Sequence, residues 1–366
     1  MKATIEERVL HFKQPAGTSR GVYTERRSWF VTVSDGERCG VGECAPLPDL
    51  SCDARPDYGE VLRGFCDRLE QTGEIPYEAM RDYPSMLFGL ETAMLSLERR
   101  TESVEFATAV PSAEGMTVAN STLCTLHSTL YDTPFSRGEV GIPINGLVWM
   151  GSYEEMLRRM EEKLDQGYHC VKLKIGAIDF DHELDLVRRI RERFSHREVE
   201  LRLDANGGFP YDEALYKLEL LSQYAIHSVE QPIRQGQWAR MAELCRDAPV
   251  PIALDEELIG VNDPGQKRQL LRIVKPAYIV LKPSLHGGIS GCREWIDLAR
   301  EEGVGSWITS ALESNVGLNA IAQFCADVYG PDIRMPQGLG TGRLFTDNIP
   351  MPLEIRGERL WVSRNS

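Results

Sequence analysis

From about residue 141 onward, short apolar, β-branched runs alternate with charged helical stretches, at a spacing of roughly 25 residues, which suits one strand–helix unit. The clear runs lie at 142–147, 170–175, 199–204, 227–231, 252–256, 278–282 and 306–309, with a weaker one near 335–339. Such alternation is typical of βα units around a parallel sheet. The sequence therefore predicts an α/β fold in which 141–335 forms a modified (β/α) TIM-type barrel, with its last segment in 336–366.

The N-terminal part of the chain has a different pattern. Residues 22–33 and 38–42 alternate as antiparallel strands do, and the turn Ser34-Asp35-Gly36 joins them. Helical stretches follow at 58–71 and 85–98. We expect an α+β domain over 1–125. The strand-like segment 352–362 is expected to return to it, because strands need partners.

Three carboxylates stand where successive apolar runs end: Asp204, Glu230 and Asp255. Parallel strands would bring all three to one edge of the sheet. Converging carboxylates repel one another unless a cation lies between them, and an all-oxygen set suits Mg²⁺, with Mn²⁺ as an alternative ion. The sequence therefore predicts a divalent metal site at the barrel mouth.

The third acid requires a choice. Along a strand Asp255 and Glu257 share a face, while Glu256 points away. Asp255 is favoured as the ligand because it ends its apolar run at the same depth as Asp204 and Glu230.

Basic residues flank the three acids in sequence. Lys172 and Lys174 share one strand face before the acids, and Lys282 ends a run after them. A metal ion that binds a substrate carboxylate stabilises the charge formed when the α-proton leaves, and a lysine then serves as the base. Arg202 and Asn206 lie on the face of Asp204 and are assigned to the substrate pocket. Lys172 and Arg202 are expected to lower the pKa of Lys174.

Five motifs follow one another in the order found in a known family. They are Lys-x-Lys at 172–174, Asp-Ala-Asn at 204–206, Glu-Gln-Pro at 230–232, Asp-Glu at 255–256 and Lys-Pro at 282–283. The set resembles the muconate-lactonising branch of the enolase superfamily, over nearly the whole chain. The resemblance implies a capping domain formed from both chain termini. It implies Lys174 as the general base, Lys172 as its electrostatic partner and Lys282 on the opposite face of the substrate.

Within that branch the chain most resembles the o-succinylbenzoate synthase family, through segments 42–48, 310–314 and 338–342. This implies a Mg²⁺-dependent hydro-lyase of menaquinone synthesis that dehydrates 2-succinyl-6-hydroxy-2,4-cyclohexadiene-1-carboxylate through a metal-stabilised enediolate. Further substrate contacts are expected at Ser310, Ser314, Gly338, Gly340, Thr18 and Ser19. The glycines would let the backbone approach a substrate carboxylate.

The residue types leave three alternatives open. An N-succinylamino acid racemase would use the same scaffold, with a lysine on each face of its substrate. A metal-free aldolase acting through a lysine imine is disfavoured by the three acids. A barrel that serves only as a binding scaffold is disfavoured because every expected charged position is filled.

Composition limits the partners. The formal net charge of −14 argues against nucleic acid and anionic membranes. No apolar run is long enough to cross a bilayer, and the charged N-terminus does not read as a signal peptide, so a cytoplasmic location is expected. A small-molecule carboxylate is the expected partner, and the oligomeric state stays open.

Overall fold

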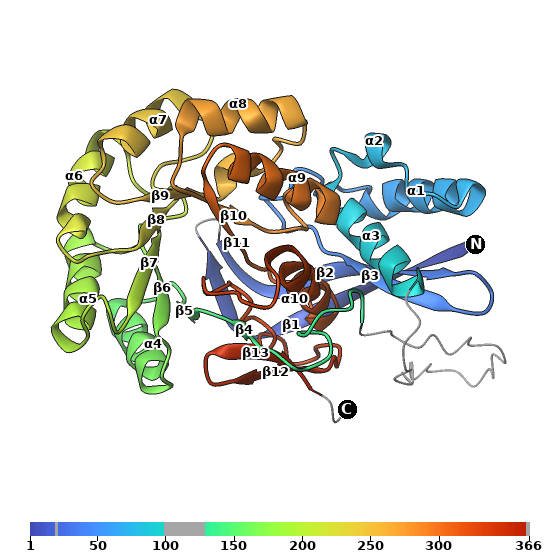
Figure 1. Cartoon of the computed structure of the whole chain (residues 1–366), viewed down its shortest axis with the longest axis horizontal. Helices are drawn as coiled ribbons and strands as arrows, with labels where there is room; N and C mark the ends of the chain where they lie inside the picture. The colour runs from blue at the N-terminus through green and yellow to red at the C-terminus, as the bar shows by residue number, and fades with distance from the viewer. Residues whose placement is uncertain (19–20, 99–128, 364–366) are drawn as a thin grey trace.

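The computed structural model describes residues 1–18, 21–98 and 129–363, with the side chains of 17 and 18 left undescribed. It consists of an N-terminal antiparallel sheet with its helices, and a curled parallel sheet surrounded by helices (Figure 1). No helix within this described part combines the length and apolar character needed to cross a bilayer.

The N-terminal sheet has the order β1-β2-β3, formed by β1 (Lys2–Thr18), β2 (Gly21–Ser34) and β3 (Cys39–Cys44). Helices α1 (Tyr58–Thr72), α2 (Tyr77–Met80) and α3 (Pro84–Glu98) accompany it. A Cβ added at Gly42 of β3 would lie 1.9 Å from the carbonyl oxygen of Gly89, so α3 packs directly on the strand backbone. The two strands and two helices expected here are confirmed, whereas β1 was not predicted.

The parallel sheet runs in chain order from β5 to β11, each strand pairing with the next. Its strands are β5 (Gly146–Val148), β6 (Cys170–Lys174), β7 (Glu200–Asp204), β8 (Ser228–Glu230), β9 (Ile252–Leu254), β10 (Tyr278–Leu281) and β11 (Gly305–Ile308). The intervening helices are α4 (Tyr153–Asp165), α5 (Phe180–Arg193), α6 (Tyr211–Ser222), α7 (Trp238–Asp247), η1 (Glu256–Leu258), α8 (Pro264–Val274) and α9 (Gly288–Glu301), and α10 (Asn315–Tyr329) follows β11. In Figure 1, α4 to α8 form an arc outside the sheet, while α9 and α10 lie on the side of the N-terminal domain.

The eighth, weaker run closes this barrel. Parallel bridges join Gln337 to Ile144, next to β5, and Gly338 to Thr309, next to β11. The predicted modified (β/α) barrel with an α+β cap is therefore confirmed. The main apolar core lies between the parallel sheet and its helices.

The C-terminal strands correct one expectation. Strands β12 (Leu353–Arg356) and β13 (Arg359–Val362) form a sheet with β4 (Ile142–Pro143), at the start of the barrel, not with the N-terminal sheet. The chain does touch the cap earlier, where Lys13 N donates to Leu344 O over 2.8 Å. The limits of the domains stay a prediction.

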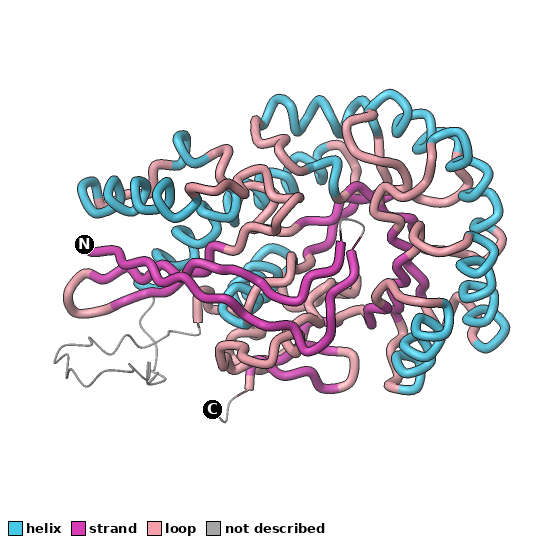
Figure 2. Tube along the Cα trace, turned by 180° about the vertical axis from the view of Figure 1, so that it is seen from behind, coloured by secondary structure: helices cyan, strands magenta, loops and turns pink. Residues whose placement is uncertain are grey.

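The β1–β2 hairpin reaches from the cap to the barrel, as the view from behind shows (Figure 2). Phe12 on β1 bridges to Phe345, and their rings lie 4.5 Å apart between centroids. This long hairpin thereby brings cap residues to the end of the barrel where the strands finish.

Candidate active site

Parallel register brings the predicted charged residues to one edge of the sheet. Lys174 pairs with Asp204, which pairs with Glu230 on the next strand. Asp255 directly follows β9 and Lys282 directly follows β10, so both stand at the same strand ends. The convergence expected from the spacing is therefore observed.

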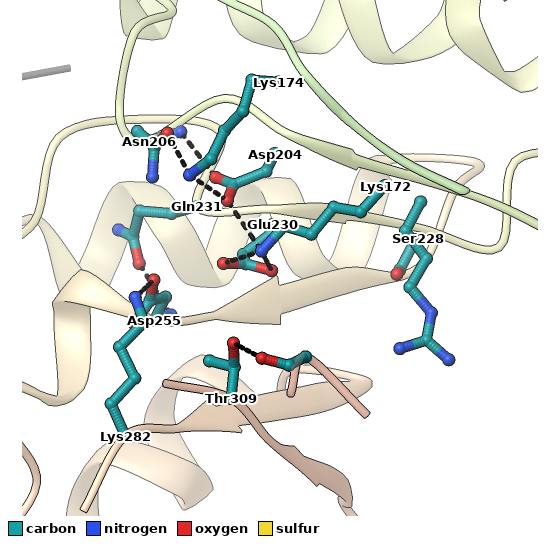
Figure 3. Close-up of polar contacts among 12 residues, drawn as sticks. Lys172, Lys174, Asp204, Asn206, Ser228, Glu230, Gln231, Asp255, Lys282 and Thr309 are labelled. Atoms are coloured by element: carbon teal, nitrogen blue, oxygen red, sulfur yellow. Dashed lines mark hydrogen bonds and ion pairs between the residues drawn. The ribbon is translucent and has the colours of Figure 1, made fainter. Parts of the chain in front are cut away.

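The three lysines contact the three acids (Figure 3). Lys172 Nζ lies 2.8 Å from Asp204 Oδ2 and 2.7 Å from Glu230 Oε2. Lys174 Nζ donates to Asp204 Oδ2 over 2.7 Å and to Asn206 Oδ1 over 2.8 Å. Lys282 Nζ contacts Asp255 Oδ2, from the side opposite Lys172 and Lys174.

Burial and mutual attraction shift the pKa values of these groups. Burial alone would raise the pKa of Asp204, but Lys172 and Lys174 outweigh it, so that pKa lies well below its ordinary value. Burial and the neighbouring Asp204 raise the pKa of Glu230. Burial would lower the pKa of Lys172, but the acids outweigh it and raise that pKa. The site thus holds a tightly balanced set of charges.

The acids have the chemistry of a divalent cation site. Asp204, Glu230 and Asp255 are 0%, 2% and 0% exposed, and they converge from three adjacent strands. Buried carboxylates need compensating charge, and oxygen donors suit a hard divalent cation. Asp255 Oδ1 makes no hydrogen bond with any described residue, which leaves one acceptor free.

The lysines supply compensating positive charge to the three acids. Among the residues described, no three acidic, histidine or cysteine side chains are arranged to hold a metal ion. Instead the ammonium groups of Lys172, Lys174 and Lys282 contact the acids directly. The donor set fits a divalent cation, which would share the compensation of the three acids with these ammonium groups.

A cavity of about 590 Å³ opens above this cluster. The three lysines and Asn206 line its floor, and Leu47 and Leu50 reach it from the cap. Asn206 holds its place with φ 45°, a left-handed conformation that asparagine tolerates better than most residues. Barrel and cap therefore share one cavity.

Some expected substrate residues line this cavity and others do not. Ser310, Gly338 and Gly340 line it. Ser314 is fully buried away from it, because its hydroxyl donates to Glu43 Oε2 and also caps α10. Thr18 ends β1, its side chain is not described, and Ser19 lies outside the described residues.

Arg202 also lies away from the cavity lining. Its Nε donates to Glu200 Oε1 over 2.7 Å and its Nη1 to the carbonyl of Pro336 over 2.8 Å. Its guanidinium stacks over the ring of Trp307 at 4.6 Å. Being two residues before Asp204, it lies deeper in the barrel, which corrects its assignment to the substrate pocket.

Glu256 is a cavity residue that the sequence interpretation missed. It is buried, lines the cavity and accepts from Asn206 Nδ2 over 2.9 Å. Burial and neighbouring Asp255 raise the pKa of Glu256 to about 7. Strand alternation failed here because β9 ends at Leu254 and the chain turns into the short helix η1.

Glu257 consequently points away, toward Gln231 and the backbone N–H of Gly236. The side-chain oxygen of Gln231 in turn accepts from the backbone N–H of Asp255 over 3.2 Å. Gln231 therefore orients the third acid. The position of Gln231 directly after Glu230, in the Glu-Gln-Pro motif, is the sequence feature that could have indicated this role.

Cap residues form a second group that was missed. Tyr23 and Gln14 of the β1–β2 hairpin line the cavity, whereas only Thr18 and Ser19 were predicted as substrate contacts in this hairpin. The hydroxyl of Tyr23 donates to the carbonyl of Pro48 over 3.0 Å, which joins the hairpin to the loop bearing Leu47 and Leu50. No sequence periodicity marks such contacts.

Known proteins share this architecture. Residues 155–365 match the family model "Enolase C-terminal domain-like", and residues 18–97 match "MenC, N-terminal domain". The o-succinylbenzoate synthase of Desulfotalea psychrophila is 44% identical over 376 residues, covering 99% of each chain.

Solved structures agree. The crystal structure of MenC from Desulfotalea psychrophila LSv54 matches with a TM-score of 0.78 at 39% identity, covering 99% of both chains. A substrate-liganded L-Ala-D/L-Glu epimerase from Bacillus subtilis shares the fold, with a TM-score of 0.76 at 20% identity over 99% of this chain and 96% of that one. The chain therefore belongs to the o-succinylbenzoate synthase family of the enolase superfamily.

Proposed function

We propose that this protein is an o-succinylbenzoate synthase, a hydro-lyase that dehydrates 2-succinyl-6-hydroxy-2,4-cyclohexadiene-1-carboxylate in menaquinone biosynthesis. The observation that carries the proposal is one cavity lined by Lys172, Lys174 and Lys282 above three buried acids. The full-length similarity to a relative of that name supports it.

Asp204, Glu230 and Asp255 are the residues that would hold the divalent cation on which enolase-superfamily enzymes generally depend. We propose Mg²⁺, with Mn²⁺ as a substitute. When bound, the ion supplies positive charge that binds the substrate carboxylate and stabilises the negative charge left by proton removal. The acceptor left free on Asp255 supports this assignment.

Lys174 is proposed as the general base. Its amine would take the α-proton of the substrate, and the resulting ammonium would then protonate the leaving hydroxide on the same face, so that water departs. Two acceptors, Asp204 Oδ2 and Asn206 Oδ1, hold Nζ in place at the cavity floor. Lys172 stands beside it, bound to Asp204 and Glu230, as a fixed positive charge.

Lys282 approaches from the opposite side of the site (Figure 3). Dehydration on one face requires no proton from it. We propose that its ammonium stabilises the anionic intermediate electrostatically. Across the cavity, Gly340 presents backbone where a side chain would occupy space, which suits a substrate with a second carboxylate arm.

The test is formation of o-succinylbenzoate by the purified protein, with Mg²⁺ and after chelation. We expect turnover that needs the divalent cation and both Lys174 and Lys282. Turnover that survives exhaustive chelation would contradict the metal assignment. Absence of product from the folded, Mg²⁺-loaded protein would overturn the proposed function.

A second activity, racemisation of N-succinylamino acids, is favoured by one observation. Lys174 and Lys282 line the same cavity from β6 and β10, so each face of a bound substrate would meet a lysine. Solvent deuterium exchange into both enantiomers would support racemisation. Exchange into one enantiomer alone, or into neither, would confine Lys282 to its electrostatic role.

A further inference from the structure

Two buried glutamates of the cap dock on the N-termini of consecutive barrel helices. Glu43 of β3 accepts from Ser314 N over 3.0 Å, from Ser314 Oγ over 2.5 Å and from Gly317 N over 2.9 Å, at the start of α10. Glu91 of α3 accepts from Ile289 N over 2.5 Å and from Ser290 N over 3.0 Å, at the start of α9. Carboxylates are favourable partners for the free N–H groups of a helix start.

The first turns of both helices are shaped for these carboxylates. A Cβ added at Gly317 would lie 2.9 Å from Glu43 Oε2, and one added at Gly288 would lie 2.3 Å from Glu91 Oε2. A larger residue at either position would therefore displace the carboxylate. Cap and barrel therefore meet at two contacts of the same kind, each between a cap carboxylate and the first turn of a barrel helix.

The Glu43 and Glu91 contacts differ in whether they lie next to the cavity. Ser314 follows Ser310, Ala311 and Leu312, which line the cavity, and Glu43 precedes the loop bearing Leu47. The Glu43 contact thus joins the cap wall of the cavity to the wall at the end of β11. By contrast, no residue of the first turn of α9 lines the cavity in the part of the chain that the structure describes.

A second carboxylate extends the Glu43 contact toward Lys282. Glu313, next to Ser314, accepts from Ala311 N over 2.7 Å and from the hydroxyl of Ser284. Ser284 lies two residues beyond Lys282. Glu313 therefore ties the loop that Glu43 holds to the segment that carries the opposite-face lysine.

Arg26 of β2 places compensating charge among these acids. It is buried, its Nη2 donates to the carbonyl of Ala45 over 2.6 Å, and it attracts Glu313 and Glu43 electrostatically. Buried carboxylates are retained at such an interface only when paired and hydrogen-bonded. Arg26, Glu43 and Glu313 can therefore balance one another only when the cap is docked on the barrel.

We propose that Glu43 is a positioning residue of the reaction: by docking on α10 it holds the 310–314 wall against the cap, in the place where the substrate is bound. The inference rests on the proposed function for its kinetic consequence only. Glu91 gives the same interface a second anchor without shaping the cavity.

The test compares two matched variants, Glu43→Gln and Glu91→Gln. The glutamine at position 43 would keep one acceptor oxygen, but its NH2 group would face a donor of α10, so part of the contact with α10 is lost. Because hydrogen bonds to charged groups contribute more than neutral ones, we expect Glu43→Gln to raise KM about tenfold or more. Glu91→Gln should change KM less than threefold, roughly the effect of a site remote from the substrate.

Hydrogen exchange of the apo protein provides a readout that needs no activity. Glu43→Gln should speed amide exchange in the 310–317 peptide and leave the 286–292 peptide near its wild-type rate, and Glu91→Gln should do the reverse. If exchange follows this pattern but no o-succinylbenzoate forms, the positioning stands and the proposed function falls.

Ser314→Ala serves where Glu43→Gln folds poorly, because it removes one donor and keeps the carboxylate. The double variant that combines Glu43→Gln with Ser314→Ala should raise KM by less than the product of the two single effects, since both changes break the same contact. Equal KM changes in Glu43→Gln and Glu91→Gln, or unchanged exchange over 310–317 in Glu43→Gln, would overturn the proposal. A fall in kcat with unchanged KM, as expected from a smaller folded fraction, would also overturn it.

Discussion

Among single residues, the contacts of the lysine ammonium groups decide the chemistry of the site. Lys174 is held by Asp204 and Asn206 at the cavity floor, whereas Lys163 lines the same cavity from α4 and contacts Gln166 over 3.4 Å. The two lysines therefore make a matched pair, one beside the acids and one away from them.

Lys174→Ala is expected to lower kcat on the order of 10²–10⁴-fold, the usual contribution of a general base. Binding of Mg²⁺ and of product should persist, because the three acids stay in place. Lys163→Ala is the control and should largely keep kcat, because Lys163 lies away from the acids even though it lines the cavity. Steady-state kinetics with calorimetric product binding make the measurement, and near-normal turnover of Lys174→Ala would refute the assignment.

A second prediction concerns the pH dependence of the Glu91 anchor. Burial raises the pKa of Glu91 to about 7, although N–H groups of Ser290 and Ile289 partly oppose the shift. Between the ordinary value of 4.5 and about 7, the folded protein therefore binds more protons at this site than the unfolded chain. The contribution of Glu91 to the free energy of unfolding must fall as the pH rises through this window.

Glu91→Gln should remove that pH dependence, so the stability of the wild type relative to the variant should decline from about pH 4.5 to about pH 7. Denaturant titration at several pH values measures it. Glu70→Gln is the control: hydrogen bonding to Ala3 N lowers the pKa of Glu70, so its linkage lies below the same window. A constant difference between wild type and Glu91→Gln would show the prediction to be wrong.

Among the structural elements, the closure of the barrel depends on the short segment at 337–338. A Cβ at Gly338 would lie 2.1 Å from Oγ1 of Thr309, which donates to the carbonyl of Gly338. A Cβ at Gly340 would meet its nearest neighbour, Ile144 Cδ1, at 3.6 Å. The two glycines therefore differ in what an added methyl group would disturb.

Gly338→Ala should cost roughly 1–3 kcal/mol of unfolding free energy, as overpacking does. Gly340→Ala should leave stability within about 0.5 kcal/mol but raise KM, because its methyl group enters the cavity wall. Thermal unfolding combined with steady-state kinetics separates the two effects. Equal loss of stability in both variants would contradict the account of barrel closure.

On the scale of the whole molecule, the acid cluster links metal binding to stability. A cation that binds the folded state alone raises the free energy of unfolding, by about 2.7 kcal/mol at a hundredfold excess over its Kd. We expect Mg²⁺ to raise Tm and chelation to reverse the rise. Asp255→Asn should abolish the shift, whereas Asp179→Asn, which alters only the cap of α5, should keep it. A Tm insensitive to Mg²⁺ in the wild type would count against the metal site.

Local pattern was sufficient for much of the site. Asp204, Glu230 and Asp255 each end an apolar run, and parallel register carries such residues to one edge. Alternation within β6 likewise placed Lys172 and Lys174 on one face. These inferences held because they depend on regular strands, whose geometry is the same in every protein.

The sequence could not predict residues placed by a change of local geometry. Glu256 enters the cavity because the short helix η1 begins directly after Asp255, where the strand geometry ends. No glycine or proline at this point of the sequence indicates the change. Arg202 shares the face of Asp204 as expected. Because it lies deeper in the barrel, however, its guanidinium binds Glu200 and stacks on Trp307, away from the cavity. Ser314 was read as a substrate contact, whereas it binds Glu43, a residue far away in the chain.

By itself the sequence determined the βα repeat, the α+β character of the N-terminal part and the order of acids and lysines. These features depend on the periodic spacing of apolar residues and on where each apolar run ends, and both can be seen in a short stretch of sequence. Tertiary structure alone decided the closure at 337–338, the pairing of β12 and β13 with β4, and the docking of Glu43 and Glu91 on the barrel helices. These features join residues distant in sequence, and their free energy comes from burial and from hydrogen bonds completed only when both partners are in place.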